Sequence, residues 1–198
     1  MIKTVVTIDF DIIMKPTIDY YSHLSSKDRM EMHNGNDALE IFHGNYEYYF
    51  RLTQWLLQMF DIVDKNNVHF ILSHEKINTI LDEHEMYDII NIDHHHDIQY
   101  GLNNTTLNCG NWVQMLHKEE RLNSYCWLNN NNSNVEEIEN LDFPYESYEF
   151  ETCSLKGLTP DILVIALSPG WVPPSLYPLF YSWVEIANAH YQTKFEIQ

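Results

Sequence analysis

Three short segments of the sequence carry residues that could bind divalent metal ions. The most specific is NIDHHHD, in which Asp93, His95 and Asp97 alternate, and in an extended segment side chains two residues apart face the same side. Carboxylate oxygens and imidazole nitrogens are both good ligands for divalent metals. This spacing predicts a metal site; the alternative is a surface turn that contains several histidines. His94 and His96 would point the other way and serve as packing or hydrogen-bonding partners.

The other two segments also follow apolar runs. Asp9 and Asp11 stand in TIDFD, and His74 stands in ILSHEK. Acids at the end of a buried strand are costly to remove from water unless they are paired or bound to a cation. A single histidine after a strand is more often a capping or hydrogen-bonding residue than a ligand. His74 therefore gains its significance from the two acidic segments.

A cysteine lies at the start of an expected helix, in the sequence NCGNW. A helix N-terminus lowers the pKa of a thiol and favours the thiolate, which would make Cys109 reactive. A buried, inert cysteine is the more usual case and is preferred on the residues alone. The three cysteines are odd in number and contain no closely spaced pair. A disulfide framework is therefore not expected, and a reducing cytoplasm is the predicted location.

The elements that must position these residues can be outlined from hydrophobic periodicity. Strands are expected at 5–13, 68–72, 87–92, 122–128 and 161–167, helices at 37–64, 74–81 (capped by Ser73), 110–118 and 175–190, and loops at 15–36, 98–108 and 129–134. The acidic stretch 136–151 has no clear period. Apolar strands alternating with helices predict one α/β domain over 1–198, a three-layer αβα sandwich with a mostly parallel sheet. In such a sheet ligands bind beyond the carboxyl ends of the strands, where the three segments lie.

The net charge and the composition limit the kinds of partner that the chain is expected to bind. The 198 residues include 29 acidic and 11 basic ones, a net charge of −18, so nucleic acid and anionic membranes are not expected partners. The excess of acidic residues fits a cationic substrate, a metal-rich site or simple solubility. The apolar run at the N-terminus is too short for a signal peptide, and no stretch approaches the roughly 18 apolar residues of a membrane span.

Together these residues resemble the arginase/deacetylase superfamily. Its ureohydrolases hold two Mn²⁺ ions with an Asp-x-His-x-Asp motif, a histidine after an earlier strand and an Asp-x-Asp pair. The matching residues here are Asp9, Asp11, His74, Asp93, His95 and Asp97. The segments TLNCG (106–110) and DILVIALSPGW (161–171) are similar to later parts of the family. The short length and NCGNW look most like the small OspR-type peptide arginases, which convert arginine residues of ribosomally made peptides into ornithine and urea.

The sequence departs from the family pattern in four ways. The Asp-x-Asp pair precedes Asp-x-His-x-Asp, so the motif order of the arginase-like fold would be permuted. Cys109 or a neighbour stands where arginases place a proton-relaying histidine. Ala166 stands where ureohydrolases place a glutamate that grips the guanidinium. No counterpart of the residues that hold the α-carboxylate of a free amino acid is found, which is compatible with a peptide substrate.

The resemblance implies a mechanism and an assignment of roles. Two Mn²⁺ ions would bridge a water, and the resulting hydroxide would attack the guanidinium carbon of an arginine in a precursor peptide. Asp9 and Asp93 would bridge the ions; His74 and Asp97 would complete one, and Asp11 and His95 the other. Asp97 and Cys109 are the residues expected to take part in catalysis.

Three alternatives stay open at this point. A strand followed by Asp-x-Asp also resembles the first motif of haloacid-dehalogenase-type phosphatases, in which Asp9 would be the nucleophile and Asp11 the general acid. That family continues with Gly/Val-Thr where this chain has Ile12-Ile13, and it gives no role to the Asp93 motif. A non-catalytic arginase-like protein that binds metal or peptide is the second alternative. The deacetylase branch is the third, but its single-zinc ligand set needs fewer acids.

Overall fold

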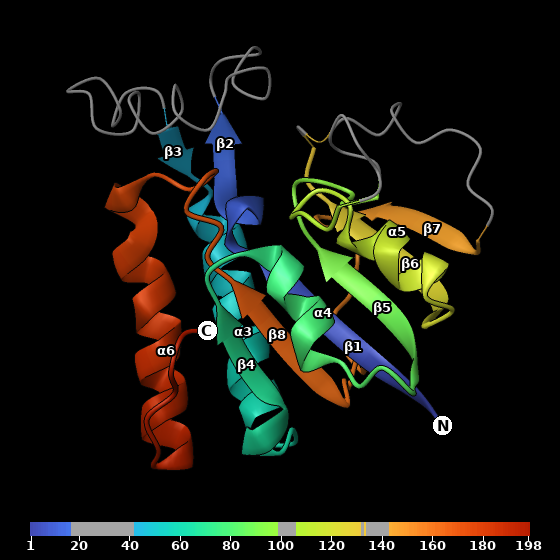
Figure 1. Ribbon diagram of the computed structural model, residues 1–198. Coiled ribbons are helices and arrows are strands. Elements are labelled where there is room, and N and C mark those ends of the chain that lie inside the picture. The colour runs from blue at the N-terminus through green and yellow to red at the C-terminus, as the bar shows by residue number, and fades with distance from the viewer. Residues whose placement is uncertain (17–41, 99–105, 132, 134–142) are drawn as a thin grey trace.

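Six parallel strands form one sheet in the order β4-β8-β1-β5-β6-β7 (Figure 1). The structure is a computed structural model that describes residues 1–16, 42–98, 106–131, 133 and 143–198. The strands of the sheet are β1 (Ile2–Asp9), β4 (Val68–Ile71), β5 (Met86–Ile92), β6 (Leu122–Asn129), β7 (Tyr145–Glu149) and β8 (Ile162–Ala166). A separate antiparallel pair consists of β2 (Met14–Pro16) and β3 (Phe42–Gly44). The prediction of an α/β fold with a mostly parallel sheet is confirmed.

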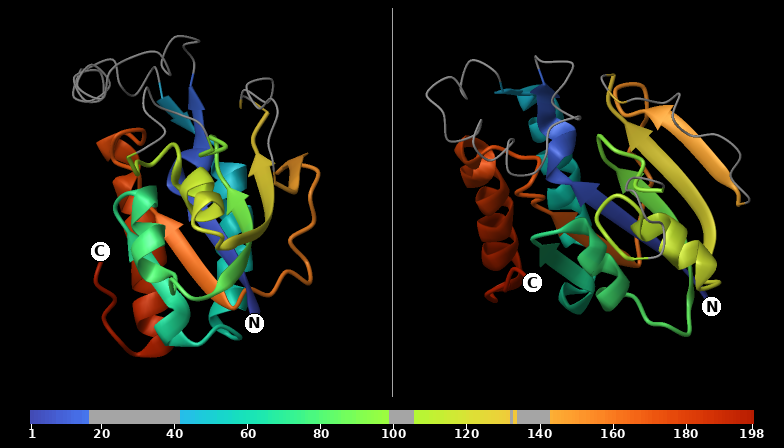
Figure 2. Two further views of the ribbon diagram at one scale, coloured as in Figure 1. Left: turned by 45° about the vertical axis from the view of Figure 1, so that its right-hand side comes forward. Right: turned by 45° about the horizontal axis from the view of Figure 1, so that its top comes forward.

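Helices cover both faces of this sheet (Figure 2). The α-helices are α3 (Tyr46–Phe60), α4 (Ile77–Ile80), α5 (Trp112–Lys118) and α6 (Tyr177–Tyr191), and the 3₁₀ helices are η1 (Phe10–Ile13), η3 (Lys65–Asn67), η4 (His74–Lys76) and η6 (Pro174–Leu176). Side chains alternate along a strand, so Val6 packs toward α3 and α6 whereas Val5 packs toward α4 and α5. The result is two cores, one on each face, an arrangement consistent with a three-layer sandwich. No helix among the described residues is long and apolar enough to cross a membrane.

The register of the sheet brings the ends of its central strands level. Ile8 of β1 pairs with Ile92 of β5, so the residues that follow, Asp9 and Asp93, leave their strands side by side. On the other side, Asp9 pairs with Ala166 of β8. Ala166 in turn pairs with Ile71 of β4, and His74 follows three residues later. The parallel topology alone therefore brings the three predicted segments to one edge of the sheet.

Several predicted boundaries are wrong, each for a local reason. The first strand ends at Asp9 rather than at residue 13, because η1 follows directly, with the Asp9 side chain accepting a hydrogen bond from the Asp11 amide. The long helix predicted from residue 37 begins at Tyr46. Asn45 caps it through its side chain, which accepts from the Tyr48 amide. Residues 37–41 lie outside the described part of the chain, as do residues 17–36 and 99–105 of the predicted loops.

Other differences concern short segments. Residues 74–80 form η4 and the single turn α4, and the Ser73 hydroxyl bonds the Glu75 carboxylate rather than capping a backbone amide. The predicted solvated loop at 129–134 begins with two buried asparagines, Asn129 and Asn130. Within the stretch 136–151, which showed no period, β7 adds to the edge of the sheet next to β6. A parallel edge strand with mostly exposed side chains lacks the apolar pattern that sequence analysis relies on.

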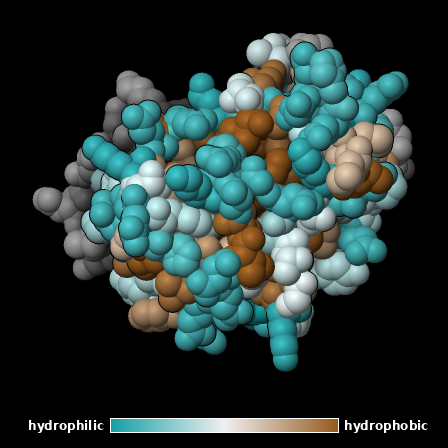
Figure 3. Space-filling model, turned by 90° about the horizontal axis from the view of Figure 1, so that it is seen from below, coloured by the Kyte–Doolittle hydropathy of each residue, from teal (hydrophilic) through white to brown (hydrophobic). Residues whose placement is uncertain are grey.

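Hydrophobic and hydrophilic side chains are mixed on the face of the molecule that is seen from below. Figure 3 shows hydrophobic groups between hydrophilic ones on that face. More than half of the accessible surface of a folded protein is ordinarily apolar, so this mixture does not by itself identify a binding face.

Aromatic packing between α3, α6 and η1 anchors one of the two cores. The Trp183 ring is fully buried, meets Phe10 edge-on with ring centroids 5.0 Å apart, and stacks on Tyr49 at 5.3 Å. Its indole nitrogen donates to the Thr53 hydroxyl at 2.7 Å. Because Phe10 directly follows Asp9, this packing fixes the segment between the two acids of β1 and η1.

Replacing Trp183 with alanine should therefore cost about 3–5 kcal/mol of unfolding free energy, through lost burial and a cavity. Urea denaturation followed by circular dichroism measures this loss. Tyr181→Ala on the same helix, where the ring is 44% exposed, is the matched control and should change stability by less than about 0.5 kcal/mol. Equal effects of the two substitutions would contradict this assignment of the core.

Candidate metal centre

Three carboxylates surround one ring nitrogen of His74. The Nδ1 atom of His74 lies 3.3 Å from Oδ2 of Asp9, 3.2 Å from Oδ2 of Asp93 and 2.9 Å from Oδ2 of Asp97. All four side chains are buried. We call these residues the first cluster. Possible ligand atoms of Asp9, His74 and Asp93 lie within 4.8 Å of one another, a separation over which they could hold a metal ion.

A second cluster shares one of these acids. The Nδ1 atom of His95 lies 2.9 Å from Oδ2 of Asp11 and 3.9 Å from Oδ1 of Asp93. Asp93 thus presents Oδ2 to His74 and Oδ1 to His95, so its carboxylate lies between the two clusters. The Asp11, Asp93 and His95 group also meets the separation expected of metal ligands. The structure therefore brings together all six residues that the sequence predicted as ligands.

The path of the chain through the Asp93 motif differs from the expected extended segment. Residues 93–95 form a bend directly after β5, and Asp97 has a left-handed backbone with φ of 52°. Within the bend, the His95 amide donates to Oδ1 of Asp93 at 2.8 Å. The first helical amides of α5 lie nearby, and Val113 donates to the Asp97 carbonyl at 3.2 Å. Convergence of these three side chains thus comes from a turn held by hydrogen bonds, not from strand alternation.

Two neighbouring histidines lie outside the clusters. The His94 amide donates to Oδ1 of Asp11 at 3.3 Å, and its ring Nδ1 lies 3.0 Å from the Asn130 side-chain oxygen. The His96 ring packs edge-on against Trp127, and its Nδ1 accepts a hydrogen bond from the Ile98 amide. Both rings therefore support the bend, as expected for packing and hydrogen-bonding partners.

Hydrogen bonds from the sheet and α5 orient the ligand atoms. The Nε2 atom of His74 lies 2.6 Å from the Thr7 hydroxyl, and a proton on Nε2 leaves the Nδ1 lone pair directed at the carboxylates. Asn91 donates to Oδ2 of Asp93 at 3.1 Å. The Trp112 indole donates to Oδ2 of Asp97 at 2.6 Å, and Ser168 bonds Oδ2 of Asp9 at 2.5 Å. Sequence analysis missed these partners, because no local signal marks residues that meet only in the fold.

The donor set fits a cation. Oδ2 of Asp11 and Nδ1 of His74 are fully buried and have no hydrogen-bond partner, although charged atoms lie near both. Asp11 and His74 belong to the two groups of side chains whose spacing could hold a metal ion. The ion-pair partners that the structure gives to the four carboxylates are His74 and His95. Four buried acids against two imidazoles leave an excess of negative charge that a metal would offset.

Burial and mutual repulsion raise the pKa of these acids. Burial, followed by the charges of Asp97 and Asp9, raises the pKa of Asp93 to about 8. Burial raises the pKa of Asp97 to about 6 against the lowering effect of the neighbouring His74. For His74 itself, burial would lower the pKa, but the three carboxylates outweigh it and raise the pKa well above its ordinary value. In the absence of metal, protons therefore compensate part of the buried charge.

The Cys109 thiol lacks the activation that a helix N-terminus would give it. Helix α5 begins at Trp112, so the cysteine precedes the helix rather than starting it. Burial, followed by the charges of Asp97 and Glu75, raises the pKa of the Cys109 thiol to about 12. The expected lowering by a helix N-terminus is thus reversed.

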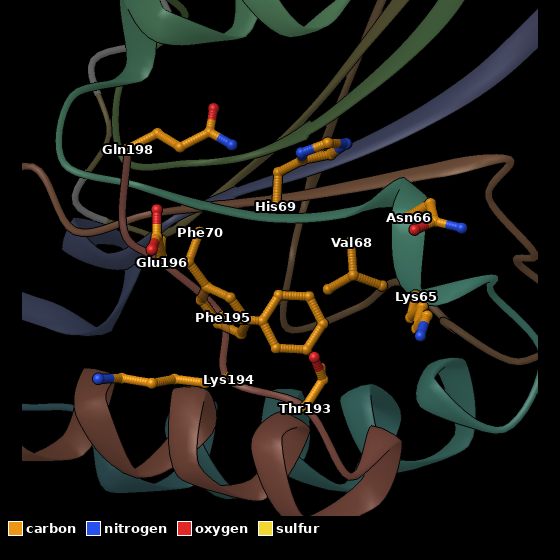
Figure 4. Close-up of a pocket in the computed structure, with 10 residues that line it drawn as sticks. All are labelled: Lys65, Asn66, Val68, His69, Phe70, Thr193, Lys194, Phe195, Glu196 and Gln198. Atoms are coloured by element: carbon orange, nitrogen blue, oxygen red, sulfur yellow. The ribbon is translucent and has the colours of Figure 1, made fainter.

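A separate hollow of about 330 Å³ lies away from this centre, between β4 and the C-terminal segment (Figure 4). Phe70 and Phe195 meet edge-on within it, and the side chains of Lys65 and Lys194 lie at opposite ends. None of its lining residues belongs to either cluster. The chemistry of the acids and histidines, not the size of this hollow, identifies the candidate site.

Comparisons with known proteins found no relative of this chain. No family model matches the chain, and neither the curated proteins nor the solved structures contain a significant match. The fold class that the structure defines is thus α/β with a parallel sheet, and its site is a buried Asp/His centre that could hold metal.

The Thr7 hydroxyl should be needed to orient His74. Thr7→Val keeps a β-branched side chain in β1 but removes the bond to Nε2, so metal affinity should fall about 10- to 100-fold. Isothermal titration with Mn²⁺ measures the change. Thr4→Val, on the same strand but distant from the edge, is the matched control and should bind metal like the wild type. Unchanged affinity in Thr7→Val would show that Thr7 does not orient the ligand.

Metal binding should strengthen with pH. Folding raises the pKa of Asp97 to about 6 and that of Asp93 to about 8, so each protonated carboxyl stabilises the metal-free folded state at low pH. This stabilisation is lost as the pH rises from the pKa of the unfolded chain through the higher pKa of the folded state. Bound metal replaces the protons. The increase in Tm caused by Mn²⁺ should therefore be larger at pH 8 than at pH 6, with protons released on binding. A smaller increase at pH 8 would contradict the assignment, and Asp93→Asn should weaken the pH dependence.

Proposed function

We propose that the protein is a two-metal hydrolase that cleaves the guanidinium group of arginine residues in a peptide, producing ornithine and urea. The observation that carries the proposal is the position of Asp93, whose two carboxylate oxygens face different histidines. A carboxylate placed in this way can hold two ions side by side. When bound about 3.5–4 Å apart, such ions supply a water-derived nucleophile at neutral pH.

The ligand set supports a division between two ions. His74 and Asp97 would complete one ion and Asp11 and His95 the other, with Asp9 and Asp93 between them. The Asp9 carboxylate contributes Oδ2 to the first cluster, while its Oδ1 accepts the Asp11 amide and so holds the second cluster next to it. Four carboxylates with two imidazoles form an oxygen-rich set, which suits Mn²⁺. Manganese as the resident metal also follows from the resemblance to ureohydrolases.

An arginine peptide fits the charge of the chain. The net charge of −18 raises the rate of encounter with a basic peptide, and added salt should weaken that effect. A peptide also needs no contact for a free α-carboxylate, for which the sequence offers no counterpart. The substrate class therefore rests on charge and on the resemblance, whereas the metal centre rests on geometry.

Two other functions are less well supported. A haloacid-dehalogenase-type phosphatase would use Asp9 and Asp11 without histidines, but here Asp9 lies against His74 and Asp11 against His95. A non-catalytic protein that binds metal or peptide would keep the same centre. It differs from the hydrolase only in turnover, so activity with metal-loaded protein separates the two.

The protein loaded with Mn²⁺ should remove about 42 Da from arginine-containing peptides, the mass lost when arginine becomes ornithine, detected by mass spectrometry. Asp93→Asn should reduce this activity by more than about 100-fold and lower the metal content, because loss of a shared ligand exceeds loss of an outer partner. Asp88→Asn is the matched control on the same strand, where Asp88 bonds Asn123 and Ser124 away from the centre.

Metal-replete protein that leaves every arginine peptide and free arginine intact would exclude the peptide arginase. Release of phosphate from an aryl phosphate with Mg²⁺ would favour the phosphatase instead. Retention of full metal content by Asp93→Asn would place the metal elsewhere.

A further inference from the structure

The two clusters of the metal centre differ in how far water reaches them. All four side chains of the first cluster are at most 6% exposed. In the second cluster Asp11 is 3% exposed, but His95 is 13% exposed, the largest value among the six side chains. We propose that the clusters hold their ions unequally: the first keeps a permanent ion, and the second an exchangeable one that enters past His95, which Trp171 positions. This inference rests on the proposed function, because it concerns how the same two-metal site is filled.

The ligand atoms of the first cluster are also more closely gathered. Three carboxylates lie 2.9 to 3.3 Å from the Nδ1 atom of His74. The second cluster has two carboxylates, and Asp11 lies 2.9 Å and Asp93 3.9 Å from the Nδ1 atom of His95. The attraction between an ion and a carboxylate grows as their separation shrinks and as water is excluded. The first cluster therefore attracts a cation more strongly than the second.

Hydrogen bonds hold the side chains of the first cluster in place independently of an ion. Each of these side chains has an outer partner, and the partners are Thr7, Asn91, Trp112 and Ser168. In the second cluster, Oδ1 of Asp11 accepts the His94 amide at the longer distance of 3.3 Å, and Oδ2 of Asp11 has no hydrogen-bond partner. Outer partners are worth about 10- to 100-fold in metal affinity. An ion at the second cluster must therefore order more of its own ligands, and it binds less tightly.

The Trp171 ring packs on the histidine of the second cluster. Its centroid lies 4.3 Å from that of the His95 ring at an interplanar angle of 49°, and the His94 ring meets His95 edge-on at 4.7 Å. The loop that carries Trp171 is anchored, because the Trp171 amide donates to the carbonyl of Ser168, whose hydroxyl bonds Asp9. The indole is only partly buried and contacts the most exposed ligand. Trp171 therefore orients His95 at the point where an ion can enter or leave.

Unequal binding would make the proposed activity follow the supply of metal. The nucleophile of a two-metal hydrolase depends on both ions. At low Mn²⁺ the chain would hold the permanent ion alone and stay inactive, and further Mn²⁺ would fill the second cluster and allow turnover. The second cluster is thus the place at which metal supply would regulate the enzyme.

Titration of the metal-free full chain with Mn²⁺ tests the difference between the clusters. Calorimetry should resolve two binding steps, the first at least about 10-fold tighter, and the spin-coupled electron paramagnetic resonance signal of a manganese pair should appear only in the second step. His95→Ala should retain one tightly bound ion without the coupled signal, whereas His74→Ala should lose the tight step. Equal affinities of the two steps in the wild type would overturn the proposal. Loss of the tight step in His95→Ala with its retention in His74→Ala would also overturn it.

The role of Trp171 is tested on the second step. Trp171→Ala should weaken that step about 10-fold and speed the release of one ion to a chelator, because the His95 ring loses its packing partner, while the first step keeps its wild-type affinity. Trp171→Phe retains a ring and should recover most of the loss. Tyr181→Ala, at an exposed aromatic residue of α6, is the matched control and should leave both steps unchanged. A wild-type second step in Trp171→Ala, or equal weakening of both steps, would overturn this role.

These measurements separate the inference from the proposed hydrolase, because metal binding is observed without turnover. Two unequal steps in a protein that leaves arginine peptides intact would support the inference and remove the hydrolase. Hydrolysis of arginine peptides by a protein with two equal steps would leave the hydrolase standing and overturn the inference. A chain that binds a single ion at saturating Mn²⁺ would overturn both.

Discussion

The buried negative charge at one edge of the sheet is the constraint on which the site depends. Four aspartates meet there out of contact with water, and burial raises the pKa of each of them. Such a group is stable only with protons, hydrogen-bond donors or cations as partners. The donors are present in the side chains of Thr7, Asn91 and Trp112, which orient His74, Asp93 and Asp97 respectively. After these bonds Oδ2 of Asp11 and Nδ1 of His74 still have no hydrogen-bond partner, and each belongs to a group of side chains that could hold a metal ion.

The proximity of these acids and histidines could be predicted from the sequence because strand ends in a parallel sheet share one edge. Continuous apolar runs marked β1, β5 and β8, and polar residues directly after them marked the edge. Once Ile8 pairs with Ile92, Asp9 and Asp93 must lie next to each other. No alignment or long-range information was needed for this step, because the topology of the sheet supplies it.

The parts that could not be predicted depend on contacts between distant residues. The alternation of Asp93, His95 and Asp97 predicted that their side chains would lie on one side of an extended segment, but a bend and the left-handed backbone of Asp97 bring them together instead. The lowered pKa considered for the Cys109 thiol is not found, because the residue precedes the helix and burial, with the charges of nearby carboxylates, raises its pKa. Likewise, β7 lies at the edge of the sheet and its sequence lacks apolar alternation. It can be recognised as a strand only from its pairing with β6.

The position of His74 connects the metal centre to the way a substrate would be held. Strand β8 lies between β4 and β1, so His74 must reach across the end of β8 to meet Thr7 and Asp9. The residue at that end is Ala166, on the face that packs against α4 and α5, where the His74 ring also meets Trp112. An acidic side chain at this place would occupy the space that the imidazole crosses and add a fifth buried carboxylate. A glutamate at position 166, which the resemblance to ureohydrolases would lead one to expect, would thus conflict with this route for His74.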